Sequence, residues 1–462
     1  MKNILAHSKV GFLIFVEFSK RQRTYFFAAA AIIAALIFTQ MKFNIFYSTN
    51  SIRIGLIGTY QEHDLPEEIT KLVSQSLVSI DESNRVKPNL VTGWDTNNDA
   101  TEFKFRLKDN LTWADGEKIK SSDLDFPIPD VTISYPDDQT IDFKLKDSYS
   151  PFPSLLTKPI FKKGTFMGIG PYKITKIEKS RVFITKIILT SVRIDLPIVY
   201  VRFYPNEKVA LTGFSLGEVQ ALLDVNNTDY FSKNTVVKIK QKTDYTKIVT
   251  VLYSMADGLV GGKNRSLRQA LSFIAPTIKD EEVANNPYPK NSWAYDGTAK
   301  KYLDNSEEAS SALERAKTQM GMDQMHKEII LTSTANLEGV GKQVVEKWKS
   351  LGFDAKVRVE SGIPQNFQAL LITQSIPSDP DQYFLWHATQ TKTNIAKVDV
   401  KRIDKDLEDG RKTINEGDRQ LLYFDFQRAL LEEAPAIFLH FPKYNIVYLK
   451  KSEKLLDKVL GI

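Results

Sequence analysis

The chain of 462 residues contains no cysteine. This absence excludes disulfide bonds, zinc sites built from thiolates, iron–sulfur clusters, a cysteine nucleophile and a lipid anchor attached to cysteine. Histidine is scarce, with 5 residues, and no two of them have the spacing of a metal-binding pair. With 22 glycines and 19 prolines, the chain is not a collagen-like or proline-rich linker protein. The sequence therefore predicts no metal site and no bound cofactor.

The body of the chain also lacks an excess of positive charge. The formal net charge is +6, but residues 1–24 carry five Lys or Arg and one Glu, which is 5 − 1 = +4. The remaining residues share 6 − 4 = +2, so we expect no basic face and no nucleic-acid partner. The composition, 42% hydrophobic and 26% charged, is that of a globular protein, and the length allows about two or three domains.

Charged residues are missing from one long apolar run, residues 25–41, which Arg23 and Lys42 bound. As a helix these 17 residues span roughly 26 Å, the short end of what crosses a bilayer core. Because positive charge tends to stay cytoplasmic, we predict a cytoplasmic basic N-terminus at 1–24, a transmembrane helix at 25–41 and an extracytoplasmic remainder. The chain is then a single-pass protein of the cell membrane. A cleaved signal peptide and a buried helix of a soluble domain are the alternatives, although no good cleavage site follows the run.

After residue 50, patterns of strands and helices alternate. Period-two alternation predicts strands at 51–58, 102–108 and 140–146. Helical spacing predicts a helix over 67–80, and residues 216–225 are expected to form a helix followed by a strand. A strand–helix–strand unit at 327–360 indicates a parallel crossover. Together these patterns predict an α/β protein with more than one lobe.

One short motif suggests an enzyme. Ser215 lies in GFSLG, residues 213–217, which matches the nucleophile elbow of serine hydrolases. The residues before it are too polar for a central strand, and no oxyanion loop of the HGG type is present. We therefore interpret Ser215 as a residue near a helix start, flanked by the turn residues Gly213 and Gly217, and predict that the chain is not an enzyme. A serine hydrolase remains an alternative.

Six segments, in order along most of the chain, resemble the extracellular solute-binding proteins of family 5, the oligopeptide- and dipeptide-type receptors of ABC importers. In the first segment, Pro88, Leu90 and Trp94 precede an alternating strand and the turn WADG at 113–116. The other five segments are GIGPYKI (168–174), TGFSLGEVQAL (212–222), NRSLRQALSFIA (264–275), DPDQYFLWH (379–387) and EEAPAIFLHF (432–441). The third of the six also accounts for the serine motif.

The resemblance implies a two-lobed periplasmic-binding-protein type 2 fold with an additional small β-rich subdomain. The lobes would close about a hinge, and a ligand that contacts both of them would stabilise the closed state. The subdomain should be trimmed, because only a short segment with two prolines separates Asp123 from Val131, where the family inserts helices. The implied parts are lobe I at 51–84, 165–250 and 437–462, the subdomain at 85–164, and lobe II at 251–436.

The implied function is that of a membrane-anchored extracytoplasmic receptor. It would bind a peptide-like ligand or other small solute in the cleft between the lobes and deliver it, as a monomer, to the permease subunits of an ABC importer. The N-terminal helix would hold it on the membrane. The alternative on the same fold is a receptor or scaffold that no longer transports.

Candidate ligand-binding residues are the polar and aromatic side chains that the resemblance places on loops facing the cleft. A structural role is the alternative for each, such as core packing for Trp386 and a turn or cap for Asn394. The candidates are Asp379, Asp381, Tyr383, Trp386, Asn394 and Tyr60.

One departure from the family concerns the amino end of the ligand. Peptide-binding members often place an aspartate four residues before the proline of the D-P pair, where this chain has Ile376. An unpaired ammonium in a cleft is costly. A peptide with a free α-amine is therefore expected only if Asp379 or Asp381 takes over this role.

Overall fold

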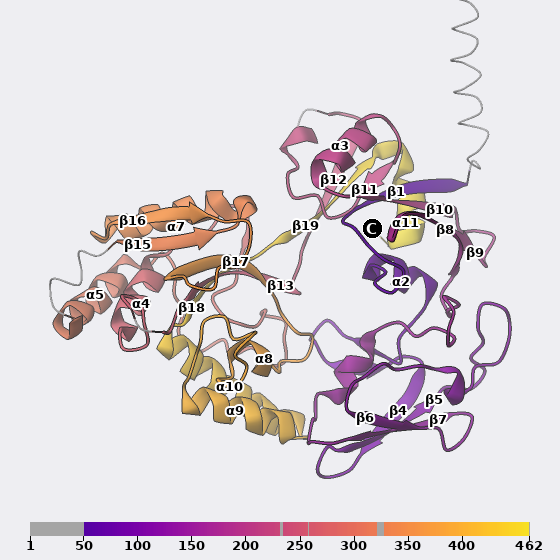
Figure 1. The fold of residues 1–462 in the computed structure, drawn as a ribbon, viewed down its shortest axis with the longest axis horizontal. Helices are drawn as coiled ribbons and strands as arrows, with labels where there is room; N and C mark the ends of the chain where they lie inside the picture. The colour runs from indigo at the N-terminus through magenta and orange to yellow at the C-terminus, as the bar shows by residue number, and fades with distance from the viewer. Residues whose placement is uncertain (1–49, 232–233, 257, 321–327, 462) are drawn as a thin grey trace, which may run out of the picture.

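The computed structural model describes residues 50–231, 234–256, 258–320 and 328–461, which form three larger sheets and a two-stranded hairpin (Figure 1). The first sheet has seven strands, in the order β12 (Val237–Thr243), β19 (Lys443–Leu449), β11 (Ala221–Leu222), β1 (Ser51–Ile57), β10 (Ile198–Tyr204), β9 (Phe183–Ser191) and β8 (Tyr172–Ser180). β1 is parallel to β10 and β11, and the other pairs are antiparallel.

The second sheet has six strands, in the order β14 (Glu282–Val283), β18 (Ala436–Phe441), β13 (Lys247–Tyr253), β17 (Ala369–Ser375), β15 (Ile329–Ser333) and β16 (Ala355–Val359). β15 and β16 are parallel and flank α7 in sequence, so the predicted strand–helix–strand crossover is confirmed. The helices of this part of the chain are α4 (Arg265–Ile274), α5 (Ser306–Met320), α7 (Glu338–Ser350), α8 (Tyr383–Trp386), α9 (Lys401–Lys412) and α10 (Glu416–Glu433).

The third sheet, β4 (Val91–Thr96), β5 (Glu102–Leu107), β7 (Thr140–Leu145) and β6 (Val131–Ser134), is antiparallel throughout. The burial of β5 alternates residue by residue, as its sequence predicts. The hairpin of β2 (Val78–Ile80) and β3 (Val86–Pro88) shares a hydrophobic core with this sheet. The remaining helices are α2 (Glu67–Val73), α3 (Glu207–Ser215), α11 (Glu453–Leu460) and the 3-10 turns η1 (Ser121–Asp123), η2 (Phe152–Thr157), η3 (Asp229–Phe231), η4 (Ala335–Leu337) and η5 (Lys450–Ser452).

Each larger sheet has its own core, and we name three parts of the molecule accordingly. The first lobe packs around the first sheet, the second lobe around the second sheet, and the β subdomain comprises β2–β7 and η2. Figure 1 shows the second lobe on the left, the first lobe at the upper right and the β subdomain at the lower right. The predicted domain boundaries within residues 51–462 stay a prediction.

The second lobe is one continuous piece of chain. All six strands of its sheet lie between Lys247 and Phe441, so the chain joins it to the first lobe only at 243–247 and 441–443. The two connections run side by side, because the backbone N–H of Asp244 donates to the carbonyl of Pro442 at 2.8 Å. Two adjacent short connections of this kind, a turn at 244–246 and the single residue Pro442, can act as a hinge.

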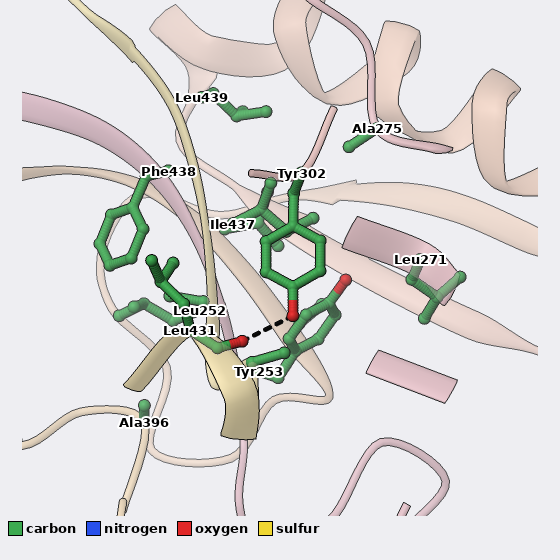
Figure 2. Close-up of a cluster of buried hydrophobic side chains, with 14 of the residues drawn as sticks. Leu252, Tyr253, Leu271, Ala275, Tyr302, Ala396, Leu431, Ile437, Phe438 and Leu439 are labelled. Carbon is green, nitrogen blue, oxygen red and sulfur yellow. Dashed lines mark hydrogen bonds between the residues drawn. The ribbon is translucent and has the colours of Figure 1, made fainter. Parts of the chain in front are cut away.

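The core of the second lobe is apolar but includes several tyrosines. Tyr302 is 5% exposed, and its hydroxyl donates to the carbonyl of Leu431 at 2.6 Å (Figure 2). Tyr253 lies beside it among leucine and isoleucine side chains. This hydrogen bond offsets the cost of removing the Tyr302 hydroxyl from water.

The helix predicted over 67–80 is wrong in its second half, because α2 ends at Val73 and Val78–Ile80 is a strand. The loop at 168–170 packs directly on the end of α2. The N–H of Gly170 donates to the carbonyl of Val73 at 2.8 Å, and Ser74 Oγ accepts the N–H of Ile169 at 3.2 Å. These contacts satisfy the helix end, and the following residues pair with β3 instead.

The helix predicted within 216–225 is also displaced. α3 occupies 207–215, where Asn206 Oδ1 caps the N–H of Val209 at 3.1 Å, and Gly217, at φ +76°, follows its end. Ser215 is thus the last residue of a helix and not near a helix start. Its Oγ contacts the carbonyl of Leu211 at 2.9 Å and the hydroxyl of Tyr230 at 3.0 Å, neither of which can activate a serine.

The predicted transmembrane helix at 25–41 and the basic N-terminus at 1–24 lie outside the described residues. Within the described ranges, none of the helices combines the length and the apolarity needed to span a bilayer.

The contact between α2 and the 168–170 loop leaves no room for a side chain at Gly168. A Cβ atom on Gly168 would lie 2.3 Å from the carbonyl oxygen of Val73, so we expect Gly168→Ala to lower the free energy of unfolding by about 1–3 kcal/mol. Gly339→Ala is the matched control, because no atom lies within 4 Å of its added Cβ in helix α7. Urea denaturation should show a neutral or stabilising control, and equal effects of both changes would contradict this packing.

Candidate functional site

A cavity of about 160 Å³ lies between the β subdomain and the second lobe. Its walls combine aromatic rings with two cations and two acids. The lining residues are Asn84, Arg85, Val86, Trp94, Thr96, Phe103, Ser150, Pro151, Pro153, Trp293, Asp379, Ile414, Glu416 and Arg419. Aromatic walls with a few fixed charges are typical of a solute-binding site.

The loop at 379–383 presents its two acids through consecutive tight turns. Asp379 Oδ1 accepts the N–H of Asp381 at 3.0 Å, and Asp381 Oδ1 accepts the N–H of Tyr383 at 3.1 Å. The hydroxyl of Tyr288 donates to the carbonyl of Pro380 at 2.6 Å. Aspartate favours such turns because its side chain can accept from backbone two residues on, so the D-P-D sequence fixes where both carboxylates point.

Asp379 is paired with an arginine of α10. Both side chains are 9% exposed, and Arg419 Nη2 lies 2.7 Å from Asp379 Oδ1. The Arg419 guanidinium makes two further hydrogen bonds: Nε donates to the carbonyl of Gly410 at 3.1 Å, and Nη2 also donates to the hydroxyl of Tyr423 at 2.9 Å. Two buried charges tolerate this environment only as a well-bonded pair.

Asp381 is paired in the same way with Arg411 at the end of α9. Arg411 Nε donates to Asp381 Oδ2 at 2.9 Å, and the side chain of Asp381 is 5% exposed. Burial raises the pKa of the Asp381 carboxyl, while Arg411 acts in the opposite direction. The Arg411 guanidinium lies 4.1 Å from the ring centre of Tyr383 and 4.9 Å from that of Tyr149. Arg411 therefore links the second lobe to the β subdomain.

Further hydrogen bonds join these two parts, and we call four of them the clasp. Three of them use backbone carbonyl groups. The clasp consists of Asn291 Nδ2 to Glu82 O at 2.6 Å, Trp293 N to Ser83 O at 2.9 Å, Ser150 N to Arg411 O at 2.7 Å and Arg85 Nε to Glu416 Oε1 at 2.8 Å. The second lobe thus contacts the rest of the molecule at the hinge and at the clasp.

The structure brings together only part of the predicted ligand-binding set. Asp379, Asp381 and Tyr383 surround the two arginines, and Asp379 lines the cavity. Trp386 lies behind them, 1% exposed, and its Nε1 donates to Gln382 Oε1 at 2.8 Å.

Asn394 and Tyr60 lie away from the cavity walls. The side chain of Asn394 is 3% exposed, donates to three carbonyls including that of Val398 at 2.8 Å, and accepts the N–H of Val398 at 3.0 Å. Tyr60 is on the first lobe, where its hydroxyl donates to the carbonyl of Ile57 at 3.3 Å and burial raises its pKa. Ligand contacts by these six residues stay a prediction.

Sequence reasoning missed the cations and the second wall of the cavity, namely Arg411, Arg419, Arg85 and Trp293. The sequence analysis treated the two acids only as candidate ligand contacts, although a buried carboxylate needs a partner. No local pattern identifies the partner arginines Arg411 and Arg419, since both come from helices that follow the acids by about thirty to forty residues.

Comparison with known proteins assigns the fold. The family model of the bacterial extracellular solute-binding proteins, family 5, matches residues 85–395, more than half of the chain. The oligopeptide-binding protein AppA of Bacillus subtilis is 22% identical, with 84% of each chain aligned. The probable D,D-dipeptide-binding periplasmic protein DdpA of Escherichia coli is 20% identical over 80% of this chain and 82% of that protein.

A solved structure shares the same architecture. NikZ from Campylobacter jejuni, in complex with Ni(L-His), superposes with a TM-score of 0.70 at 20% identity, covering 87% of this chain and 94% of that chain. The predicted α/β periplasmic-binding-protein fold is therefore confirmed for the described part of the chain.

The buried ion pair of Asp379 and Arg419 predicts that replacing one partner destabilises the protein more than replacing both. Arg419→Met leaves the Asp379 carboxylate buried and unpaired, so we expect it to lower the free energy of unfolding by about 3–5 kcal/mol. Asp379→Asn in the Arg419→Met background removes that charge and should restore much of the loss. Urea denaturation of both variants measures this coupling, and a double variant as unstable as the single one would contradict it.

Proposed function

The chain belongs to the bacterial extracellular solute-binding proteins of family 5, and from this premise we propose that it is a receptor that binds a peptide-like solute between its lobes and delivers it to an ABC importer. The observation that carries the proposal is the hinge: 247–441 is joined to the first lobe only through two adjacent segments. Rotation about such a hinge opens and closes a cleft. A ligand that contacts both lobes drives closure by its preference for the closed state.

The cleft supports solute binding more than catalysis. Arg419 and Arg411 are already paired with Asp379 and Asp381. Ser215 lies on an exposed helix end in the first lobe. The relatives, whose names describe an oligopeptide, a D,D-dipeptide and a nickel–histidine complex, are solute-binding proteins. A peptide-like solute is the cargo that these names share most closely.

The proposal includes a membrane anchor. Residues 25–41 would cross the cell membrane once and hold the receptor, as a monomer, on the extracytoplasmic side. Such a tether keeps the receptor near its permease subunits and raises its effective concentration there.

A second candidate is a receptor or scaffold on the same fold that does not transport. It is favoured by Ile376, which stands at the family's usual amine-anchor position and is 8% exposed within the second-lobe core. Because Asp379 and Asp381 are already paired with arginines, they do not provide a free acid for an α-ammonium.

Native mass spectrometry of the purified full-length chain tests the proposed function. We expect masses of co-purified peptide-like solutes that are lost after unfolding and refolding. The refolded protein should gain thermal stability from a diverse peptide pool, because a ligand that binds only the folded state stabilises it. An empty receptor whose unfolding temperature does not respond to any peptide would favour the non-transporting candidate.

The pairing of Asp379 and Asp381 with arginines predicts that the α-amine of a bound peptide contributes little to its affinity. An ammonium–carboxylate hydrogen bond contributes about 1.5–3 kcal/mol, or roughly 10- to 150-fold in affinity. Since both candidate acids are occupied, we expect N-acetylation of a bound peptide to change its dissociation constant by less than about threefold. Isothermal titration of matched free and acetylated peptides measures this ratio. Loss of binding on acetylation would show that an acid is released to the ligand.

A further inference from the structure

The loop between β9 and β10 exposes two apolar side chains. Ile194 is 99% exposed and Val192 is 50% exposed, whereas Leu196 packs against the first-lobe core. An isoleucine held almost entirely in water gains nothing from the fold of the described residues. We call residues 191–196 the 191–196 loop.

Hydrogen bonds hold the loop in this arrangement. Arg193 and Asp195 form a two-pronged ion pair across Ile194, with Nε to Oδ1 at 3.1 Å and Nη2 to Oδ2 at 2.7 Å. The N–H of Val192 donates to the carbonyl of Pro171 at 3.1 Å, and Lys458 Nζ donates to the carbonyl of Asp195 at 3.1 Å. Two of these four hydrogen bonds hold the loop backbone, at Val192 and at Asp195, on either side of Ile194.

The loop also lies where the chain enters the first lobe. Asn50 Nδ2 donates to the carbonyl of Leu196 at 3.4 Å, and the N–H of Ile198 donates to the carbonyl of Asn50 at 3.0 Å. The apolar run ends at Met41, so residues 42–50 are all that separate it from this point. Nine residues extend over at most about 32 Å, so the loop cannot lie far from a membrane that 25–41 crosses.

We propose that the 191–196 loop is a membrane-contact site that inserts Val192 and Ile194 into the lipid interface beside the anchor. The inference rests on the proposed transmembrane anchor and goes beyond it, because a flexible tether alone would leave the receptor free to tumble. Apolar side chains at the headgroup boundary bind by burying their surface. Arg193 is already paired with Asp195, so the contact depends on apolar burial and not on anionic lipid.

This contact gives the first lobe a fixed orientation. The loop joins the ends of β9 and β10 on the first sheet, while the chain enters and leaves the second lobe through the hinge (Figure 1). The first lobe then rests on the membrane and the second lobe carries the opening motion.

The absence of cysteine makes the test direct, because one introduced cysteine is a unique labelling site. The full-length chain, labelled with bimane at Ile194→Cys, is reconstituted in phosphatidylcholine vesicles in which some lipids carry a nitroxide near the top of the acyl chain. We expect quenching at least about twofold stronger than for the same label at Ile363→Cys, which is 57% exposed on the second lobe. Adding phosphatidylglycerol should leave the ratio unchanged.

A second variant separates insertion of the loop from insertion of the dye. With the label at Val192→Cys, the additional change Ile194→Asp should reduce quenching to the level of Ile363→Cys. Vesicle flotation is measured on every sample. Protein that floats but shows equal quenching at both positions would overturn the membrane-contact site and leave the anchor intact. Protein that does not float would overturn the anchor and the contact together.

Discussion

The hinge between the two lobes is the constraint on which the rest of the structure depends. A single stretch of chain builds the entire second sheet, and it leaves and returns through two segments that hydrogen-bond to each other. Two adjacent connections permit rotation of one lobe against the other but resist separation of the lobes. In the proposed receptor, a ligand that touches both lobes would act on this one rotation. The separate hydrophobic cores allow each half to move as a packed body.

The second constraint is the cost of burying charge. Asp379 and Asp381 lie on a loop at the edge of the second lobe, and both are nearly inaccessible to water. The fold meets this cost with Arg419 and Arg411, which come from two consecutive helices and are aimed at the same loop. Arg411 also faces Tyr149 of the β subdomain, so the electrostatics of one lobe are coupled to contacts with another part of the molecule. The two ion pairs consequently hold the 379–383 loop against α9 and α10.

The sequence predicted features that depend on local periodicity and on ordered motifs. The alternation in β5 and the crossover of β15, α7 and β16 could be found from spacing alone, and the family could be found from six segments in order. The end of α2 could not, because a distant loop carrying Gly168 and Gly170 determines it. The position of α3 was missed because the residues before Ser215 are polar on a helix whose exposed face is wide. At the site, the acids were predictable but the arginines were not, since helix packing in three dimensions selects them.

The clasp sets a limit on what can be bound without further motion. The cavity beside it has a volume of about 160 Å³, the space of roughly five water molecules and less than the about 300 Å³ at the lower end of usual ligand pockets. Three of the four clasp hydrogen bonds end on backbone carbonyl groups, so they do not depend on the accepting residue's side chain. A solute the size of a peptide must then either lie elsewhere between the lobes or part the clasp. In the second case, the solute has to replace those hydrogen bonds with its own, and a peptide backbone, which carries both donors and acceptors at regular spacing, is chemically suited to do so.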